Sequence, residues 1–331
     1  MIKKTILITG AAGFIGRHLV WKVLETTNWD VVTLDGLGYA ADVSAFVESP
    51  HYDEKRVKNN WHDLRAPVTD SLIEKIRHCD YVVNVASMSH VDKSIEDPVG
   101  FFTNNCALIA NVLECCRKSI RPEKFIQIST DEVFGPANFG TAHKEWDTHL
   151  PSNPYSASKS AQESLCFSYW RTYDLPIIIC NTMNNFSHGQ HSEKFIPKCI
   201  SKILNNEEME IHGSFVNREF VSGSRYWLHA SQHAEAIVFI LKNKTPARYP
   251  ETTRPSRWNI VGEKEVSNLE IAEKIGKILN KVPIIKKTDF HSSRPGHDLR
   301  YALDGSKLEG DGWKPSESFE DGLERTVNKT I

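Results

Sequence analysis

The sequence predicts a doubly wound α/β fold, in which helices cover both faces of an open parallel sheet. The first observation is that short, almost wholly apolar β-branched runs alternate with longer amphipathic stretches through the first half of the chain. Such strands need cover on both faces, and the stretches between them are long enough to be crossover helices. The second observation is a glycine-rich turn directly after the first run. Together they favour an α/β domain with its site at the carboxyl edge of the sheet.

The expected elements follow from these runs. Strands are expected at residues 4–9, 30–35, 56–61, 80–87, 124–130 and 176–182, and the clearest helices at 99–118 and 154–173. Beyond residue 183 the pattern loosens, with helices expected at 194–205, 230–242 and 267–280 and a strand at 257–261 that could rejoin the first sheet. We therefore expect a first domain of residues 1–183 plus about 225–262, and a smaller α/β lobe of residues 184–224 plus 263–331.

The composition excludes several classes of protein. The 331 residues include 40 basic and 42 acidic side chains, a formal charge of -2, without the basic cluster that binds nucleic acid. The strongly apolar stretches are far shorter than the roughly 20 residues that cross a bilayer, so we expect a soluble protein with no membrane partner. Seven cysteines without a CxxC pair indicate reduced thiols in a cytoplasmic protein. Histidine pairs lack a third ligand, so no metal is expected.

The turn after the first strand predicts a dinucleotide site. It contains three glycines at every third position, namely Gly10, Gly13 and Gly16. Glycines let backbone N–H groups and a helix N-terminus approach a pyrophosphate. Asp35, at the end of the second strand, can bind the adenosine ribose 2′-hydroxyl and would repel a 2′-phosphate. We therefore expect a Rossmann domain that binds NAD; the alternatives are a tight turn without ligand, or partial acceptance of NADP through Arg17.

Tyr155 and Lys159 form a candidate proton-transfer pair. They lie four residues apart in PYSASK and share one face of the helix that this segment opens. A phenol has a pKa of about 10 and needs a nearby cation to act as a base near neutral pH. Lys159 could supply that charge and reach the nicotinamide ribose. The alternative is an exposed helix pair, but the preceding dinucleotide motif favours catalysis.

Thr130, Asp131 and Glu132 stand at the carboxyl end of the expected fifth strand, where open α/β sheets build their sites. Two neighbouring carboxyls in a partly buried site cannot both ionise cheaply, so they can divide into an acid and a base. Adjacent strand residues face opposite ways, so the backbone must turn here for both carboxyls to enter the site. The alternative is a polar loop that caps the following turn.

Six motifs carry a family resemblance, namely TGAAGFIG, SHVDKS, TDEVFG, PYSASK, EKFIP and RPGHDLRYALD. They resemble the extended short-chain dehydrogenase/reductase superfamily and, within it, the dTDP-glucose 4,6-dehydratases. The similarity runs from residue 3 to the C-terminal FEDGLERTV. The Thr-Asp-Glu triplet is its specific part, because related 4-epimerases and decarboxylases share the glycines and the Tyr-Lys pair but not usually both carboxyls. The resemblance also implies a homodimer paired through helices 99–118 and 154–173.

The mechanism implied by the resemblance is an internal redox cycle with tightly held NAD on a nucleotide-diphosphate sugar. Tyr155, assisted by Thr130, takes the proton from the sugar 4-hydroxyl while NAD accepts the C4 hydride. Glu132 then removes the C5 proton, Asp131 protonates the departing 6-hydroxyl, and the hydride returns to C6. The product is a 4-keto-6-deoxy sugar.

Further binding residues carry over from the resemblance. NAD contacts are expected at Phe14, Ile15, Asp63, Leu64, Ser87 and Thr103. Asp63 could accept a hydrogen bond from the adenine amino group, or be a solvated loop carboxylate. Substrate contacts are expected at Ser89, Asn185, Glu193, Lys194, Arg225, Arg294 and Tyr301. An arginine fork suits a diphosphate, and the alternative for each position is an exposed polar side chain or a helix cap.

The departures from the family pattern cluster around substrate recognition. Met88 stands where these dehydratases usually have glutamate, SHGQHS precedes EKFIP, and SFVNREFVSGS has an irregular length. The base, whether dTDP, UDP or GDP, and the sugar C2 substituent are therefore left open. Alternative functions are a nucleotide-sugar 4-epimerase, a 5,6-dehydratase that stops before hydride returns, and a catalytically silent NAD-binding sensor.

Overall fold

The computed structural model describes residues 3–289 and 298–331, whose contacts divide the chain into two compact units. The first unit consists of Met1–Val133, Asn153–Asn181 and Ala234–Trp258. The second consists of Phe134–Ser152, Thr182–His233 and Asn259–Ile331. The glycine turn, the Thr-Asp-Glu triplet and the Tyr-Lys pair therefore all belong to the first unit.

A seven-stranded sheet with the order β12-β6-β5-β4-β1-β2-β3 forms the centre of the first unit. Its strands are β1 (Thr5–Thr9), β2 (Asp30–Asp35), β3 (Val57–Trp61), β4 (Tyr81–Asn84), β5 (Lys124–Thr130), β6 (Ile177–Thr182) and β12 (Ser256–Ile260). The pairs β1–β2, β1–β4, β2–β3 and β4–β5 are parallel. The doubly wound fold is confirmed, and the run expected at 257–261 does rejoin this sheet. The strand order reverses between β1 and β4, where such sheets bind ligands.

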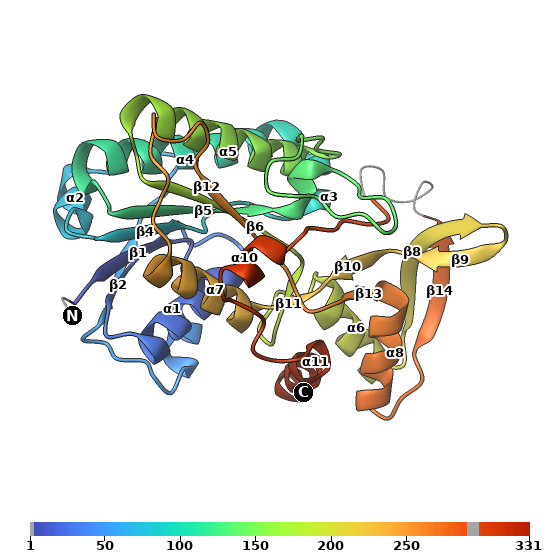
Figure 1. The fold of residues 1–331 in the computed structure, drawn as a ribbon. Coiled ribbons are helices and arrows are strands. Elements are labelled where there is room, and N and C mark those ends of the chain that lie inside the picture. The colour runs from blue at the N-terminus through green and yellow to red at the C-terminus, as the bar shows by residue number, and fades with distance from the viewer. Residues whose placement is uncertain (1–2, 290–297) are drawn as a thin grey trace. The chain divides into compact units, whose positions relative to one another are not determined.

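Helices cover both faces of this sheet (Figure 1). Two lie on one side, α1 (Phe14–Thr26) and α7 (Ala230–Asn243), and two on the other, α4 (Pro98–Cys115) and α5 (Pro154–Tyr173). Shorter helices are α2 (Asp70–Ile76) and α3 (Val91–Glu96). Apolar side chains of α4 and α5 share one buried core with the strands, including Leu108, Val112 and Trp170 with Val82 and Phe125. Burial of these side chains is the main stabilising contribution to the unit.

Within the described residues, the helical stretch Pro98–Ile120 is long and apolar enough to cross a membrane. The sequence predicted only short apolar runs, because polar side chains such as Asn104 and Asn105 interrupt this helix without lowering its mean hydropathy below that level. The core helix of a soluble protein meets the same criterion of length and composition. Leu108, Ile109 and Leu113 of this stretch are buried in the core of the first unit. One face of the stretch therefore packs into the core of the first unit.

The second unit contains smaller sheets and its own core. β14 (Ile284–Asp289), β8 (Glu208–Val216) and β9 (Glu219–Ser222) form one sheet. The two-stranded sheets pair β10 (Ser224–Tyr226) with β13 (Glu265–Ser267), and β7 (Asn185–Phe186) with β11 (Leu228–His229). Its helices are α6 (Phe195–Leu204), α8 (Asn268–Ile278), α10 (Ser306–Gly310) and α11 (Phe319–Thr330). α6 and α8 confirm the helices expected at 194–205 and 267–280, and α7, described above, confirms the one expected at 230–242.

Residues 134–152 belong to the second unit although they directly follow the end of β5 and its turn. The Ala137 N–H donates to the Arg300 carbonyl at 3.0 Å, and the His143 N–H donates to the Ala302 carbonyl at 2.9 Å. The Arg300 guanidinium also donates to the Thr141 carbonyl at 2.7 Å. Because these partners lie more than 150 positions along the chain, no local pattern places this segment with them.

A buried ion pair joins α5 to β12. Glu163 and Arg257 are 3% and 2% exposed and contact each other directly. The second Glu163 oxygen accepts a hydrogen bond from the Asn181 amide at 2.8 Å, and the same amide donates to the Thr130 carbonyl at 3.1 Å. The pair therefore supports the end of β5 as well as the two elements that carry it.

We predict that Arg257→Met lowers the free energy of unfolding by about 3–5 kcal/mol, because it leaves the Glu163 charge buried without its arginine. Chemical denaturation measures this loss. The control is the double variant Arg257→Met/Glu163→Leu, which removes both charges and should recover most of the stability. A single variant within about 1 kcal/mol of wild type contradicts the importance of the pair.

Candidate active site

The glycine turn between β1 and α1 leaves no room for a side chain at Gly10 or Gly16. Gly10 has a φ of +66°, and a Cβ there would lie 2.7 Å from the Ala86 backbone at the end of β4. A Cβ on Gly16 would collide with the carbonyl of Gly10. Gly10 must therefore be glycine both for its backbone conformation and because two strand ends approach each other closely.

The N-terminus of α1 offers donors suited to a dinucleotide phosphate. Its N-cap is Gly13, which has no side chain to cap the first N–H groups of the helix, where Phe14 and Ile15 lie. Asp35, 7% exposed at the end of β2, accepts hydrogen bonds from the Ala12 N–H at 2.9 Å and the Leu37 N–H at 2.7 Å. The uncapped backbone N–H groups of α1, next to a turn with no room for a side chain at Gly10 or Gly16, fit the pyrophosphate of NAD. The Asp35 carboxylate at the end of β2 fits its ribose.

The turn after β5 brings three of the predicted catalytic side chains together with Tyr155. Residues Asp131–Phe134 form a 3-10 turn, so the chain leaves the strand conformation as the sequence required. The Thr130 hydroxyl donates to the Asp131 carboxyl at 2.9 Å and accepts from the Glu132 N–H at 3.3 Å. Tyr155 makes a hydrogen bond with Thr130 and feels the charges of both carboxyls. A phenol, an alcohol and two carboxyls thus form one cluster.

The environment of Tyr155 favours the neutral phenol. Burial raises the pKa of Tyr155 above the ordinary value, the charges of Glu132 and Asp131 raise it further, and the hydrogen bond with Thr130 lowers it. Its ring packs edge-on against Phe101 of α4, with 6.2 Å between ring centres. Protonation of Asp131 would remove one of the two negative charges that oppose the phenolate form of Tyr155. A protonated Asp131 is also the form that an acid at this position requires.

Lys159 lies one turn beyond Tyr155 and is held by neutral groups. Its ammonium donates to the Ile128 carbonyl and to the Gln162 side chain, both at 2.7 Å. Burial lowers the pKa of Lys159 to about 7. Gln162 in turn donates to the Asn105 carbonyl of α4 at 2.9 Å. Sequence analysis missed Gln162, although its spacing of three residues from Lys159 on one helix was a usable signal.

The cofactor residues predicted outside the glycine turn differ in burial and in their contacts. Asp63 lies after β3 and forms a two-pronged ion pair with Arg65, whose hydrogen bonds lower the pKa of Asp63. Leu64 is buried, Ser87 follows β4 and is partly buried, and Thr103 is an exposed residue of α4. The predicted substrate residue Ser89 is exposed two positions after Ser87.

The other predicted substrate residues belong to the second unit, where two of them are engaged internally. The Arg225 guanidinium donates to the carbonyls of Leu299 and Asp298 at 2.9 and 2.7 Å and lies 4.5 Å from the centre of the Tyr301 ring. Asn185 donates to the Met183 carbonyl at 2.9 Å. Glu193 and Lys194 are partly buried just before α6. Arg294 lies outside the described residues.

In the described part of the chain, no group of three or more His, Cys, Asp or Glu side chains is arranged to hold a metal ion. His233 is fully buried, donates from Nδ1 to the side-chain oxygen of Asn185 at 3.1 Å, and has a pKa lowered by burial to about 3. It is therefore a neutral core histidine at any ordinary pH. All seven cysteines are free thiols, as predicted.

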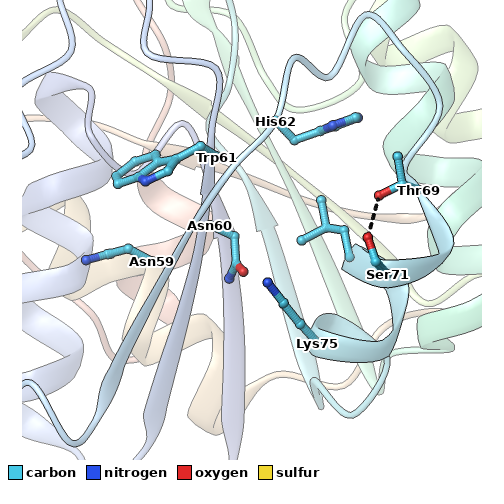
Figure 2. A pocket seen from close by; sticks show the side chains of 8 residues that line it. Asn59, Asn60, Trp61, His62, Thr69, Ser71 and Lys75 are labelled. Atoms are coloured by element: carbon cyan, nitrogen blue, oxygen red, sulfur yellow. Dashed lines mark hydrogen bonds between the residues drawn. The ribbon is translucent and has the colours of Figure 1, made fainter.

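A separate cavity of about 300 Å³ lies at the edge of the sheet beside β3 and α2 (Figure 2). Its lining is mostly polar and consists of Asn59, Asn60, Trp61, His62, Thr69, Ser71, Leu72 and Lys75. The Thr69 and Ser71 hydroxyls, at the start of α2 on one side of the cavity, lie within hydrogen-bond distance at 3.3 Å (Figure 2). None of these residues belongs to the Thr130 cluster, so the cavity is separate from that cluster.

The chain is similar over its whole length to enzymes of one family. The family model described as GDP-mannose 4,6 dehydratase matches residues 7–326. The dTDP-glucose 4,6-dehydratase of Haemophilus influenzae is 35% identical, covering 97% of this chain and 96% of that protein. The low-salt glycan biosynthesis protein Agl12 of Haloferax volcanii is also 35% identical, covering 98% of this chain and 97% of that protein.

Solved structures agree with this relationship. The dTDP-glucose 4,6-dehydratase DesIV of Streptomyces venezuelae, solved with NAD bound, has a TM-score of 0.85 at 30% identity and covers 98% of this chain and 96% of its own. The UDP-glucuronic acid 4-epimerase of Bacillus cereus has the same TM-score at 26% identity, with 98% of both chains covered. The chain therefore belongs to the NAD-dependent nucleotide-sugar 4,6-dehydratases of the extended short-chain dehydrogenase/reductase superfamily.

Proposed function

We propose that this enzyme converts a nucleotide-diphosphate hexose, of the dTDP-glucose or UDP-glucose type, into its 4-keto-6-deoxy derivative. The observation that carries the proposal is the cluster of Thr130, Asp131, Glu132 and Tyr155 at the carboxyl end of β5. A 4-epimerase needs one base at the 4-hydroxyl. A 4,6-dehydratase needs that base and also a base at C5 and an acid at the 6-oxygen, and the two carboxyls can fill these two further roles.

The first step proposed is oxidation at C4. Tyr155 accepts the proton of the 4-hydroxyl, and Thr130 donates a hydrogen bond to the same oxygen. When bound, NAD supplies a positively charged ring that accepts the C4 hydride and later returns it to C6. Lys159, whose charge is present below about pH 7, is proposed to move to the nicotinamide ribose and favour the phenolate.

The second step proposed is elimination of water across C5 and C6. The C4 ketone makes the C5 proton acidic, and Glu132 takes that proton. The electron pair of the broken C5–H bond forms a C5–C6 double bond while the C6–O bond breaks, and Asp131 donates a proton so that water leaves. Return of the hydride to C6 and of a proton from Glu132 to C5 completes the 4-keto-6-deoxy sugar, with no net change in oxidation state. The proton that Tyr155 took from the 4-hydroxyl passes to solvent and Asp131 takes one back, which restores both groups for the next cycle.

The position of Asp35 supports NAD over NADP. Its carboxylate is fixed by two backbone N–H groups at the strand end where the adenosine ribose is expected. A fixed negative charge there repels a 2′-phosphate. Arg17, the residue that could have favoured NADP, pairs with Asp42 at 3.6 Å. Its charge is thereby partly compensated within the protein.

We also infer that the enzyme is a cytoplasmic homodimer. The free thiols agree with a reducing compartment. Large apolar side chains are exposed on α4 and α5, where Val99 is 76%, Phe102 44% and Tyr173 48% exposed. A second copy that packs against these two helices would remove this apolar surface from water.

The substrate prediction is tested by incubating the protein with a panel of dTDP-, UDP- and GDP-hexoses and weighing the products. We expect at least one sugar to lose the mass of one water and, in heavy water, to take up deuterium at C5. An unchanged mass with inversion at C4 would identify an epimerase. No reaction with any sugar, while NAD remains bound, would favour a catalytically silent protein.

Glu132→Gln should keep bound NAD and C4 oxidation but slow water loss by about 100-fold or more, because the amide cannot take the C5 proton. Product mass over time gives the rate, and NAD released on denaturation shows that the cofactor site is intact. Turnover equal to that of the wild type would refute the role of Glu132 as the C5 base.

Light scattering should give twice the mass of one chain. Replacing two exposed apolar residues by charge, as in Val99→Glu/Phe102→Glu, should shift the protein towards the monomer because it places charges on the surface expected to be buried. The matched control Phe215→Glu changes an exposed phenylalanine outside α4 and α5. A dimer that survives the α4 changes would place the interface elsewhere.

A further inference from the structure

Asn153 contacts the carboxyl of Glu132 while capping the helix that carries Tyr155. It is the N-cap of α5, is 6% exposed, and precedes Tyr155 by two residues. Its side-chain oxygen accepts from the Ser156 N–H at 2.8 Å, and its side-chain nitrogen donates to Glu132 Oε2 at 3.0 Å. The backbone N–H of Asn153 meets the Ser156 hydroxyl at 3.2 Å, which completes a capping box.

The orientation of this amide follows from the chemistry of its two partners. The Ser156 N–H can only donate, so it requires the oxygen of the Asn153 amide. The nitrogen is then turned to Glu132, where a carboxylate oxygen accepts. Reversing the amide would set N–H against N–H and oxygen against carboxylate. Both ends of the short Asn153 side chain are therefore occupied, and it offers Glu132 a rigid donor.

Asparagine is suited to this double task in a way that the other good N-caps are not. Serine, threonine and aspartate also cap helices well. Aspartate has no donor for Glu132 and would add a second negative charge, and the serine hydroxyl is shorter than the asparagine amide. A cap alone does not require asparagine, whereas a cap that also donates to a neighbouring carboxylate does.

We propose that Asn153 is the positioning residue for the C5 base. It fixes Glu132, which has three rotatable bonds, relative to Tyr155, because one residue sets both the start of α5 and the direction of the carboxylate. The backbone N–H of Tyr155 donates independently to the Ser94 hydroxyl at 3.1 Å, so the backbone at Tyr155 retains a second anchor. Asn153 thus serves elimination more than C4 oxidation. The inference rests on the proposed dehydration.

The experiment compares Asn153→Ser and Asn153→Asp with wild type, using full-length protein, NAD and the nucleotide sugar that the wild type dehydrates. Both variants keep an N-cap but lose the amide donor. Substrates deuterated at C4 or at C5 report which bond limits the rate. Ser267→Ala, which removes the N-cap of α8 in the second unit, controls for general loss of stability.

We expect both Asn153 variants to slow product formation by about tenfold to one-hundredfold, the effect of losing one hydrogen bond to a charged group. The isotope effect should increase for C5 deuterium, and NADH absorbance should accumulate because oxidation outpaces elimination. The Ser267→Ala control should show neither change.

Two results would overturn the proposal. One is turnover unchanged in both variants. The other is a larger C4 isotope effect without NADH accumulation, which would mean that Asn153 acts by placing Tyr155. Failure of the proposed function would look different, because the wild type itself would then yield no dehydrated product. If Asn153→Ser does not fold, the isosteric Asn153→Asp variant alone decides between these outcomes.

Discussion

The constraint on which the site depends is the meeting of the end of β5 with the start of α5. β5 ends in a 3-10 turn at Asp131, and α5 begins at an asparagine cap, so backbone bends and caps determine where the reactive groups lie. A regular strand would have sent Asp131 and Glu132 to opposite faces of the sheet. The turn lets two carboxyls gather beside one phenol.

Behind this junction lies a buried network of neutral polar groups that crosses the sheet. Thr9 donates to Asn84 at 2.6 Å, Asn84 to Gln127 at 2.9 Å, and Gln127 to Gln162 at 3.1 Å, which also accepts from Lys159. Buried polar groups are costly unless satisfied, and each of these contacts satisfies its neighbour. The network links the strand before the glycine turn to Lys159 without adding a charge beside it.

Local patterns predicted most of the fold. All seven strands of the sheet, its two long helices and the later helices α6, α7 and α8 could be predicted, because hydrophobic periodicity and turn residues act over a few positions. The glycine turn with Asp35 and the motif around Tyr155 could be predicted from the sequence for the same reason. The sequence did not predict that residues 134–152 belong to the second unit, because their hydrogen-bond partners Arg300 and Ala302 are remote in the chain.

By itself the sequence determined the parallel sheet, the dinucleotide turn and the inventory of acid, base and alcohol, because those depend on residue type and short spacing. Only the tertiary structure decided which way these groups point. It turned Lys159 towards Gln162, engaged Arg225 with backbone carbonyls, and aimed the Asn153 amide at Glu132. Hydrogen-bond partners of this kind come from separate elements, and local sequence patterns do not predict which elements will pack together.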